Sequence, residues 1–130
     1  MDLVKVSRAD LAWLYPGEPL EPVARRWLSY GPALVVVTRG PDGSTAFTAA
    51  GARQVDGAPV KVVDTIGAGD AFMSGLLARL YELGLLDRGR LESPPDELAD
   101  VLQYAIRVSA LTCTRAGAEP PTKSEVAAWT

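Results

Sequence analysis

The fold is decided by the stretch Val62-Val63-Asp64-Thr65-Ile66-Gly67-Ala68-Gly69-Asp70-Ala71-Phe72, which passes from a β-branched run through a glycine turn into a segment of helical periodicity. Residues 60–63 predict a buried strand, and the chain from about Asp70 to Leu83 predicts a helix. Its apolar residues recur at helical spacing on one side: Phe72, Met73, Leu76, Leu77 and Leu80. A buried strand that turns directly into an amphipathic helix is typical of an α/β domain.

The glycine turn itself predicts an anion site. At the start of the helix, the backbone N–H groups of Ala68, Gly69 and Asp70 lack partners within the helix, and the helix dipole favours negative charge there. Gly67 and Gly69 carry no Cβ, so an anion can approach the backbone closely. Asp70 adds a carboxylate beside that site, where a base could accept a hydroxyl proton. The alternative is that these residues only cap the helix. The strand before the turn and the amphipathic helix after it favour the anion site over that alternative.

The rest of the chain alternates strands and helices. Strands are predicted at residues 2–6 and 33–37, and helices at 8–15, after Pro19–Pro22 and from about 96 to 116. A small hairpin at residues 45–48 and 53–55 interrupts this order, and a last short helix is predicted at 123–129. The pattern predicts one α/β domain over residues 1–130, with a mainly parallel sheet flanked by helices and a small β-hairpin insertion.

Composition excludes several classes of protein. The 130 residues carry a net charge of −3, which argues against a nucleic-acid or anionic-membrane partner. No apolar run reaches the ~20 residues of a membrane-spanning helix, and the first residues do not form a signal peptide, so a cytoplasmic protein is expected. The chain has no histidine and a single cysteine, Cys113, which excludes Ser-His-Asp and Cys-His catalysis and an internal disulfide.

Residues 64–70 resemble the Asp-Thr-x-Gly-Ala-Gly-Asp signature of the ribokinase-like (PfkB) carbohydrate kinases, and Ala71, Phe72, Gly75 and Leu76 continue the match. The resemblance implies ATP-dependent phosphorylation of a sugar hydroxyl with Mg²⁺-ATP as the donor. It implies that Asp70 is the base and that Gly67, Ala68 and Gly69 form the anion hole.

Two other segments resemble nucleotide-site segments of that family. Thr38 and Gly40, which follow the strand at residues 33–37, resemble the family's Thr-x-Gly loop and would lie near the ATP phosphates. A simple turn at the end of the strand is the alternative. Ser7 and Asp10 stand where the family commonly has Asn and Glu, a region that helps to organise Mg²⁺ and phosphate. Serine there is frequent in fructokinase-like members, and a helix N-cap at Ser7 is the alternative.

The C-terminal stretch resembles the family segment that encloses adenine and a monovalent cation. The resemblance implies that Ala105 lies near adenine. The alternative is that Ala105 is simply a core residue of its helix. The resemblance also implies that K⁺ could be held by the side chain of Asp64 and by carbonyl groups of four other residues: Ile66, Thr112, Arg115 and Gly117.

The resemblance covers the family's C-terminal, nucleotide-binding portion, and the N-terminal half that supplies most sugar contacts and the lid is not part of this sequence. Three hypotheses follow. In the first, the chain is the ATP-binding part of a sugar kinase that needs its other half or a partner. In the second, it is a non-catalytic nucleotide-binding remnant. In the third, it is a structural or interaction domain that keeps the motif. An apolar sheet edge left by the missing strands would favour a homodimer or a partner chain.

Overall fold

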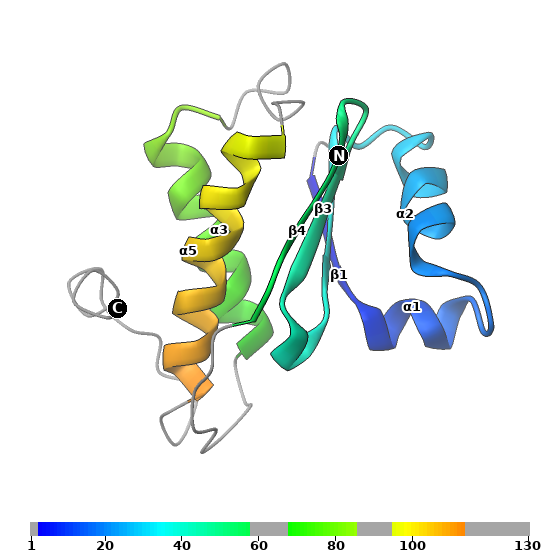
Figure 1. Cartoon of the computed structure of the whole chain (residues 1–130), viewed down its shortest axis with the longest axis horizontal. Coiled ribbons are helices and arrows are strands. Elements are labelled where there is room, and N and C mark those ends of the chain that lie inside the picture. The colour runs from blue at the N-terminus through cyan, green and yellow to red at the C-terminus, as the bar shows by residue number, and fades with distance from the viewer. Residues whose placement is uncertain (1–2, 58–67, 86–94, 114–130) are drawn as a thin grey trace.

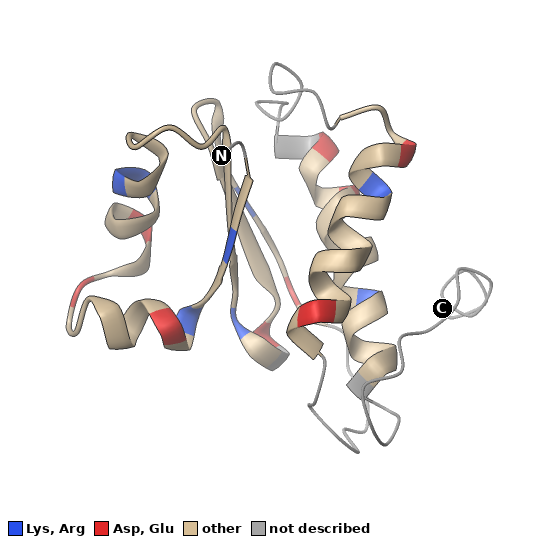
Figure 2. Ribbon diagram, turned by 180° about the vertical axis from the view of Figure 1, so that it is seen from behind, with Lys and Arg blue, Asp and Glu red and all other residues tan. Residues whose placement is uncertain are grey.

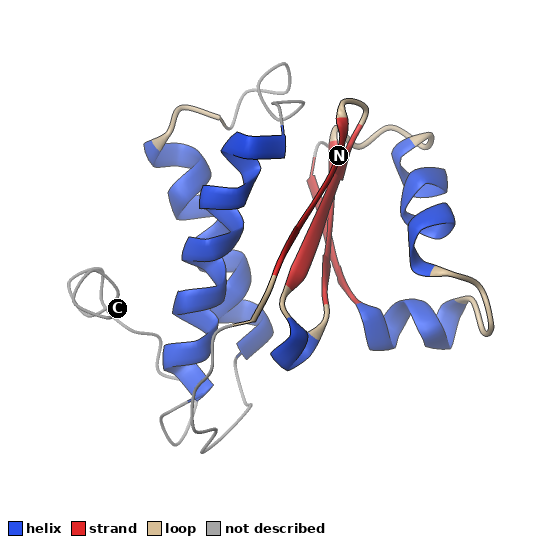
Figure 3. Ribbon diagram, viewed as in Figure 1, coloured by secondary structure: helices blue, strands red, loops and turns tan. Residues whose placement is uncertain are grey.

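The described strands form one mixed sheet between two layers of helices (Figure 1). The structure, a computed structural model, describes residues 3–57, 68–85 and 95–113. The strands are β1 (Leu3–Ser7), β2 (Leu34–Thr38), β3 (Ser44–Thr48) and β4 (Gly51–Val55), in the order β1-β2-β3-β4. The helices are α1 (Arg8–Leu14), α2 (Leu20–Leu28), α3 (Ala68–Glu82) and α5 (Pro95–Cys113), with a short 3₁₀ helix, η1 (Gly40–Asp42), after β2. Figure 3 shows the strands between the helices.

The α/β class is confirmed, but the described part of the sheet is mixed rather than mainly parallel. Only β1 and β2 run parallel, and the pairings β2–β3 and β3–β4 are antiparallel. The reason is the hairpin, which joins the sheet as two full strands instead of standing apart as an insertion. The strand predicted at residues 60–63 and the helix predicted at 123–129 lie outside the described residues.

The core is organised by β2, whose side chains are buried on both faces of the sheet. Leu34 and Val36 pack against α3 and α5, whereas Val35 and Val37 pack against α1 and α2, and none of the four has exposed surface. Burying one such side chain is worth about 1.5–3 kcal/mol. The strand therefore holds both helical layers to the same sheet.

Helices α3 and α5 pack closely against each other on one face. Leu76 and Leu80 of α3 lie in the same fully buried cluster as Leu98 and Leu102 of α5. The closest approach is at Gly75, where an added Cβ would lie 2.9 Å from Cγ2 of Val108 and 3.2 Å from Cα of Ala105. A side chain at position 75 would therefore force the two helices apart.

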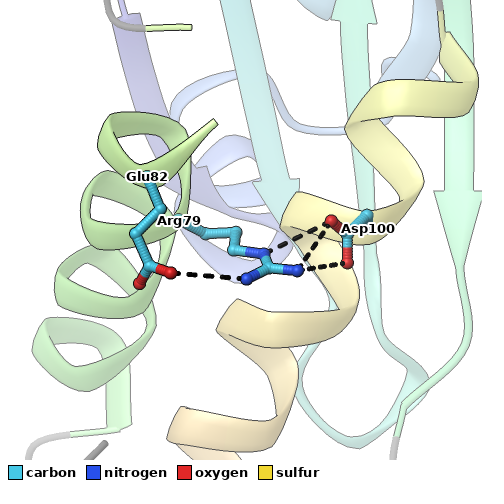
Figure 4. A network of polar contacts seen from close by, with 3 residues as sticks. All are labelled: Arg79, Glu82 and Asp100. Carbon is cyan, nitrogen blue, oxygen red and sulfur yellow. Dashed lines mark hydrogen bonds and ion pairs between the residues drawn. The ribbon is translucent and has the colours of Figure 1, made fainter. Parts of the chain in front are cut away.

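An ion-pair network joins the same two helices at their exposed side (Figure 4). Arg79 of α3 donates to Asp100 of α5, with Nη2–Oδ2 and Nε–Oδ2 distances of 3.0 and 3.3 Å, and its Nη1 lies 3.5 Å from Oε2 of Glu82. Two parallel N–H donors to one carboxylate fix its orientation. The network therefore links the two helices at a second point, outside their buried contact.

Among the described helices, none is both long and apolar enough to cross a membrane.

Gly75→Ala should destabilise the protein by about 1–2 kcal/mol, because overpacking against the stiff Val108 side chain outweighs the helix propensity of alanine. Urea unfolding followed by circular dichroism measures this. Ser74→Ala, at an exposed position of the same helix, is the control and should be neutral or slightly stabilising. Combining Gly75→Ala with Val108→Ala should cost less than the sum of the two changes. Equal stability of Gly75→Ala and Ser74→Ala would show that the helices are not in close contact there.

Candidate active site

The C-terminal ends of β1 and β2 bring two of the predicted residues together. Ser7 and Thr38 are directly paired across the parallel ladder. Ser7 leads immediately into α1, and Thr38 leads into η1. Loops that follow parallel strands emerge at the same edge of a sheet, where ligands of α/β proteins bind. Figure 1 shows the starts of α1, η1 and α3 together at this edge.

Ser7 is the N-cap of α1. Its Oγ accepts a hydrogen bond from the backbone N–H of Asp10 at 3.0 Å, so the helix-cap interpretation is confirmed. The cap holds Asp10 in the first turn of α1, with an exposed side chain. The role of these two residues toward Mg²⁺ and phosphate stays a prediction.

The segment after β2 is a compact loop. The backbone N–H of Arg39 donates to the carbonyl of Gly43 at 2.7 Å, and the N–H of Gly43 donates to that of Gly40 at 3.3 Å. Gly40 has a φ of 57°, in the left-handed region that favours glycine, and open space lies beside it. Backbone at an exposed glycine can come close to a ligand, which the prediction for Thr38 and Gly40 requires.

An ion pair connects this loop with the start of α1. Nη2 of Arg8 lies 3.1 Å from Oδ2 of Asp42, and both side chains are more than half exposed. Such a surface pair adds little to stability. It links η1 to the start of α1 at the edge where Ser7 and Thr38 meet.

The N-terminus of α3 completes this edge. Ala68 and Gly69 form its first residues, and Asp70 stands exposed in its first turn. The hydroxyl of Ser109, on α5, donates to the carbonyl of Ala68 at 3.1 Å. On the sheet side, Nζ of Lys5 lies 3.3 Å from the position that a Cβ on Gly69 would occupy. The start of α3 is thus held between α5 and β1, close to the end of β1 at Ser7.

The predicted cation ligands are mostly not described. Asp64, Ile66, Arg115 and Gly117 lie outside the described residues, as does Gly67 of the predicted anion hole. Thr112 is fully buried, and its Oγ1 donates to the carbonyl of Val108 at 2.9 Å. Within the described ranges, no group of three or more acidic, histidine or cysteine side chains is placed to hold a metal ion.

Ala105, a residue of α5, is fully buried against α3, where it packs on Gly75. This placement supports the alternative interpretation, a core residue of the helix. An open hollow of about 390 Å³ lies between α5 and the end of β4. It is lined by Arg53, Gln54 and Val55 of β4, by Asp56 directly after that strand, and by Ala99, Gln103, Ile106 and Arg107 of α5. They include none of the predicted site residues.

Sequence reasoning missed three contributors to this edge: Lys5, Ser109 and the Arg8–Asp42 pair. The alternation of β1 could have indicated the position of Lys5. A strand places every second residue on the same face, so Lys5 lies on the same face as Leu3, which packs against the cluster under α3 and α5. Ser109 lies within the helix predicted from about 96 to 116, and helical spacing alone does not show that its hydroxyl donates to the start of α3. The Arg8–Asp42 contact spans 34 residues, and no local pattern predicts it.

Comparison with known proteins gives one consistent family. Residues 1–125 match the family model described as pfkB family carbohydrate kinase. A fructokinase of Rhizobium leguminosarum bv. trifolii is 39% identical over 92 residues, covering 71% of this chain and 28% of the relative. A probable chloroplastic fructokinase-6 of Arabidopsis thaliana is 37% identical over 130 residues, covering 96% of this chain and 32% of the relative. The chain thus spans about a third of the length of these relatives.

Solved structures agree. A fructokinase of Xylella fastidiosa with bound ATP superposes with a TM-score of 0.86 at 28% identity, over 97% of this chain and 41% of that one. A double mutant of the Vibrio cholerae fructokinase, solved with fructose, ADP and potassium, gives 0.81 at 32% identity, over 98% of this chain and 40% of that one.

Removing the Ser109 hydroxyl should loosen the start of α3. We expect Ser109→Ala to cost about 1 kcal/mol of stability and to speed hydrogen exchange of the amides of residues 72–75, which donate to the carbonyl groups of the first turn of α3. Ser29→Ala is a matched control, because it removes a hydroxyl-to-carbonyl hydrogen bond at the end of α2. Exchange measured by mass spectrometry at residues 72–75 should rise in the first variant only. Equal exchange in both variants would mean that Ser109 does not hold the helix start.

Proposed function

The chain belongs to the pfkB family of carbohydrate kinases, and from this premise we propose that it is the ATP-binding, C-terminal portion of a kinase that phosphorylates a sugar hydroxyl. In this proposal Asp70 is the base, and the Gly67–Gly69 turn is the anion hole. Thr38 and Gly40 lie near the ATP phosphates.

The observation that carries the proposal is the position of Asp70. Its carboxylate is exposed in the first turn of α3, at the sheet edge where β1 and β2 end. The helix N-terminus offers backbone N–H groups and a favourable dipole to an anion. A proton acceptor next to a place for a phosphoryl group is the minimum that a sugar kinase requires.

The proposed chemistry follows from this arrangement. The hydroxyl oxygen of the sugar attacks the γ-phosphorus of ATP while its proton passes to the Asp70 carboxylate, and ADP leaves with the electrons of the broken P–O bond. The N–H groups at the start of α3 stabilise the charge on the transferring oxygens. Asp70 later releases its proton to solvent, which its exposure allows.

Mg²⁺ in phosphoryl-transfer sites is bound largely by phosphate oxygens and water, with one or two carboxylates. Asp10, exposed after the end of β1, is the side chain that would take part, directly or through water. K⁺ would be held by Asp64 together with carbonyl groups of Ile66, Thr112, Arg115 and Gly117. These ions neutralise phosphate charge when bound.

The acceptor is proposed to be a ketose. Support comes from the relatives named fructokinase and from Ser7, which stands where fructokinase-like members often carry serine. The sugar pocket would come from an N-terminal half or from a partner chain, a second copy included. Fructose and 2-keto-3-deoxygluconate are the first substrates to test.

Asp70→Asn should lower turnover by a factor of at least ~10²–10⁴ while Mg²⁺-ATP affinity largely survives, because the amide accepts no proton but leaves the anion hole in place. Calorimetry measures ATP binding, and a coupled ADP assay measures turnover in the active assembly. Glu21→Gln, which neutralises an exposed carboxylate on α2, is the control and should change neither. An active Asp70→Asn variant would eliminate Asp70 as the base.

The isolated chain should bind ATP without efficient transfer, because holding donor and acceptor in line supplies much of the rate. A panel of ketoses, aldoses and nucleosides, assayed with the chain alone and with a longer polypeptide that carries an N-terminal half, tests this. Transfer to a ketose by the longer polypeptide is the expected result. A folded chain that binds no ATP in calorimetry would contradict the proposed function.

A further inference from the structure

Lys5 is the charged residue on the face of β1 that lies against α3 and α5. Leu3 packs into the cluster under those helices, whereas Val4 and Val6 pack on the opposite side. Lys5 shares the orientation of Leu3 and pairs in register with Val36, a fully buried residue of the same face. The side chain is half-buried, so its methylene groups lie against apolar surface while the ammonium extends along the face.

The ammonium group ends at the first turn of α3. Nζ lies 3.3 Å from the place where a Cβ of residue 69 would stand. Because residue 69 is glycine, nothing separates the ammonium from the backbone at the helix start. The ammonium therefore lies beside the first turn of α3, whose N–H groups the proposed function assigns to the phosphoryl group.

This position is electrostatically unfavourable for a cation without an anion. The N-terminus of a helix carries about half a positive charge, and a lysine there adds to it. No ion pair joins Lys5 to Asp70 or to another carboxylate among residues 3–57, 68–85 and 95–113. The ammonium and the helix N-terminus therefore bring positive charge to the same small region, and the single carboxylate of Asp70 in that turn offsets only part of it. An anion between them would be stabilised by both.

We propose that Lys5 binds the terminal phosphate of ATP at the start of α3 and neutralises its oxygens during transfer, as a catalytic residue in addition to Asp70. The inference rests on the proposed function of this site. A lysine suits the role because its ammonium acts as a mobile point charge that can follow a moving phosphoryl group. Arg8, exposed at the same edge, is already engaged with Asp42.

Calorimetry with Mg²⁺-ATP and Mg²⁺-ADP tests the proposal. Lys5→Met keeps the length and packing of the stem and removes the charge, and it should weaken ATP binding about tenfold and ADP binding much less. Lys5→Arg should retain most of the ATP affinity. Arg26→Met removes one positive charge on α2, where the side chain pairs with Glu18, and should leave both affinities unchanged.

A second measurement needs no variant. The sequence has three lysines, Lys5, Lys61 and Lys123, so reductive methylation followed by peptide mass spectrometry reports on each separately. ATP should slow methylation of Lys5 several-fold more than ADP does. This readout serves even where Lys5→Met fails to fold.

The outcomes separate this inference from the function on which it rests. Wild-type protein that binds no ATP would refute the proposed function itself. Wild-type binding with unchanged ATP affinity in Lys5→Met, or equal losses for ATP and ADP, would overturn the role of Lys5 at the terminal phosphate and leave the function standing. Equal protection of Lys5 by ATP and ADP would overturn it as well.

Discussion

The burial of β2 on both faces is the constraint on which the rest of the structure depends. Four consecutive aliphatic residues, from Leu34 to Val37, have no exposed surface, so each face of the sheet must be covered along the whole strand. Helices α1 and α2 cover one face, and α3 and α5 cover the other. Figure 2 shows charged residues on the helices of both layers and also within the strands. The same burial fixes the edge at which β1 and β2 end, which is where the candidate active site lies.

The candidate site is positioned largely by packing remote from it. The start of α3 lies where it does because the helix packs tightly on α5 at Gly75 and is held by the hydrogen bond from Ser109 to the carbonyl of Ala68. The Arg79–Asp100 pair links the same two helices further along. A shift of one helix past the other would move the N–H groups away from the ends of β1 and β2. Precision at the site is therefore a property of the helix pair as a whole.

Local patterns predicted the elements well because each depends on near neighbours. The N-cap at Ser7 was predicted from the residue type alone, because serine is a preferred N-cap. The burial of Phe72, Leu76 and Leu80 was predicted from their helical spacing. Leu77 was placed on the same apolar side but is 39% exposed, because α5 and the sheet cover a narrower stripe of α3 than its apolar residues span. Gly51 was expected in the hairpin turn and belongs to β4, since the turn is made by residues 49–50 alone.

What local patterns could not supply is the pairing of distant segments. The pairing of β1 with β2, the Arg8–Asp42 contact and the approach of Lys5 to Gly69 each join positions more than 25 residues apart, and the motif alone says nothing about them. They also bear most directly on mechanism. The described residues place a carboxylate and a cation around one helix N-terminus, yet Asp70 remains exposed to water. If Asp70 is the base, as proposed, phosphoryl transfer requires that water be excluded from it, and the described residues alone leave it open. In the proposed function these residues therefore supply the donor side of the reaction, and the surface that covers Asp70 comes from outside them.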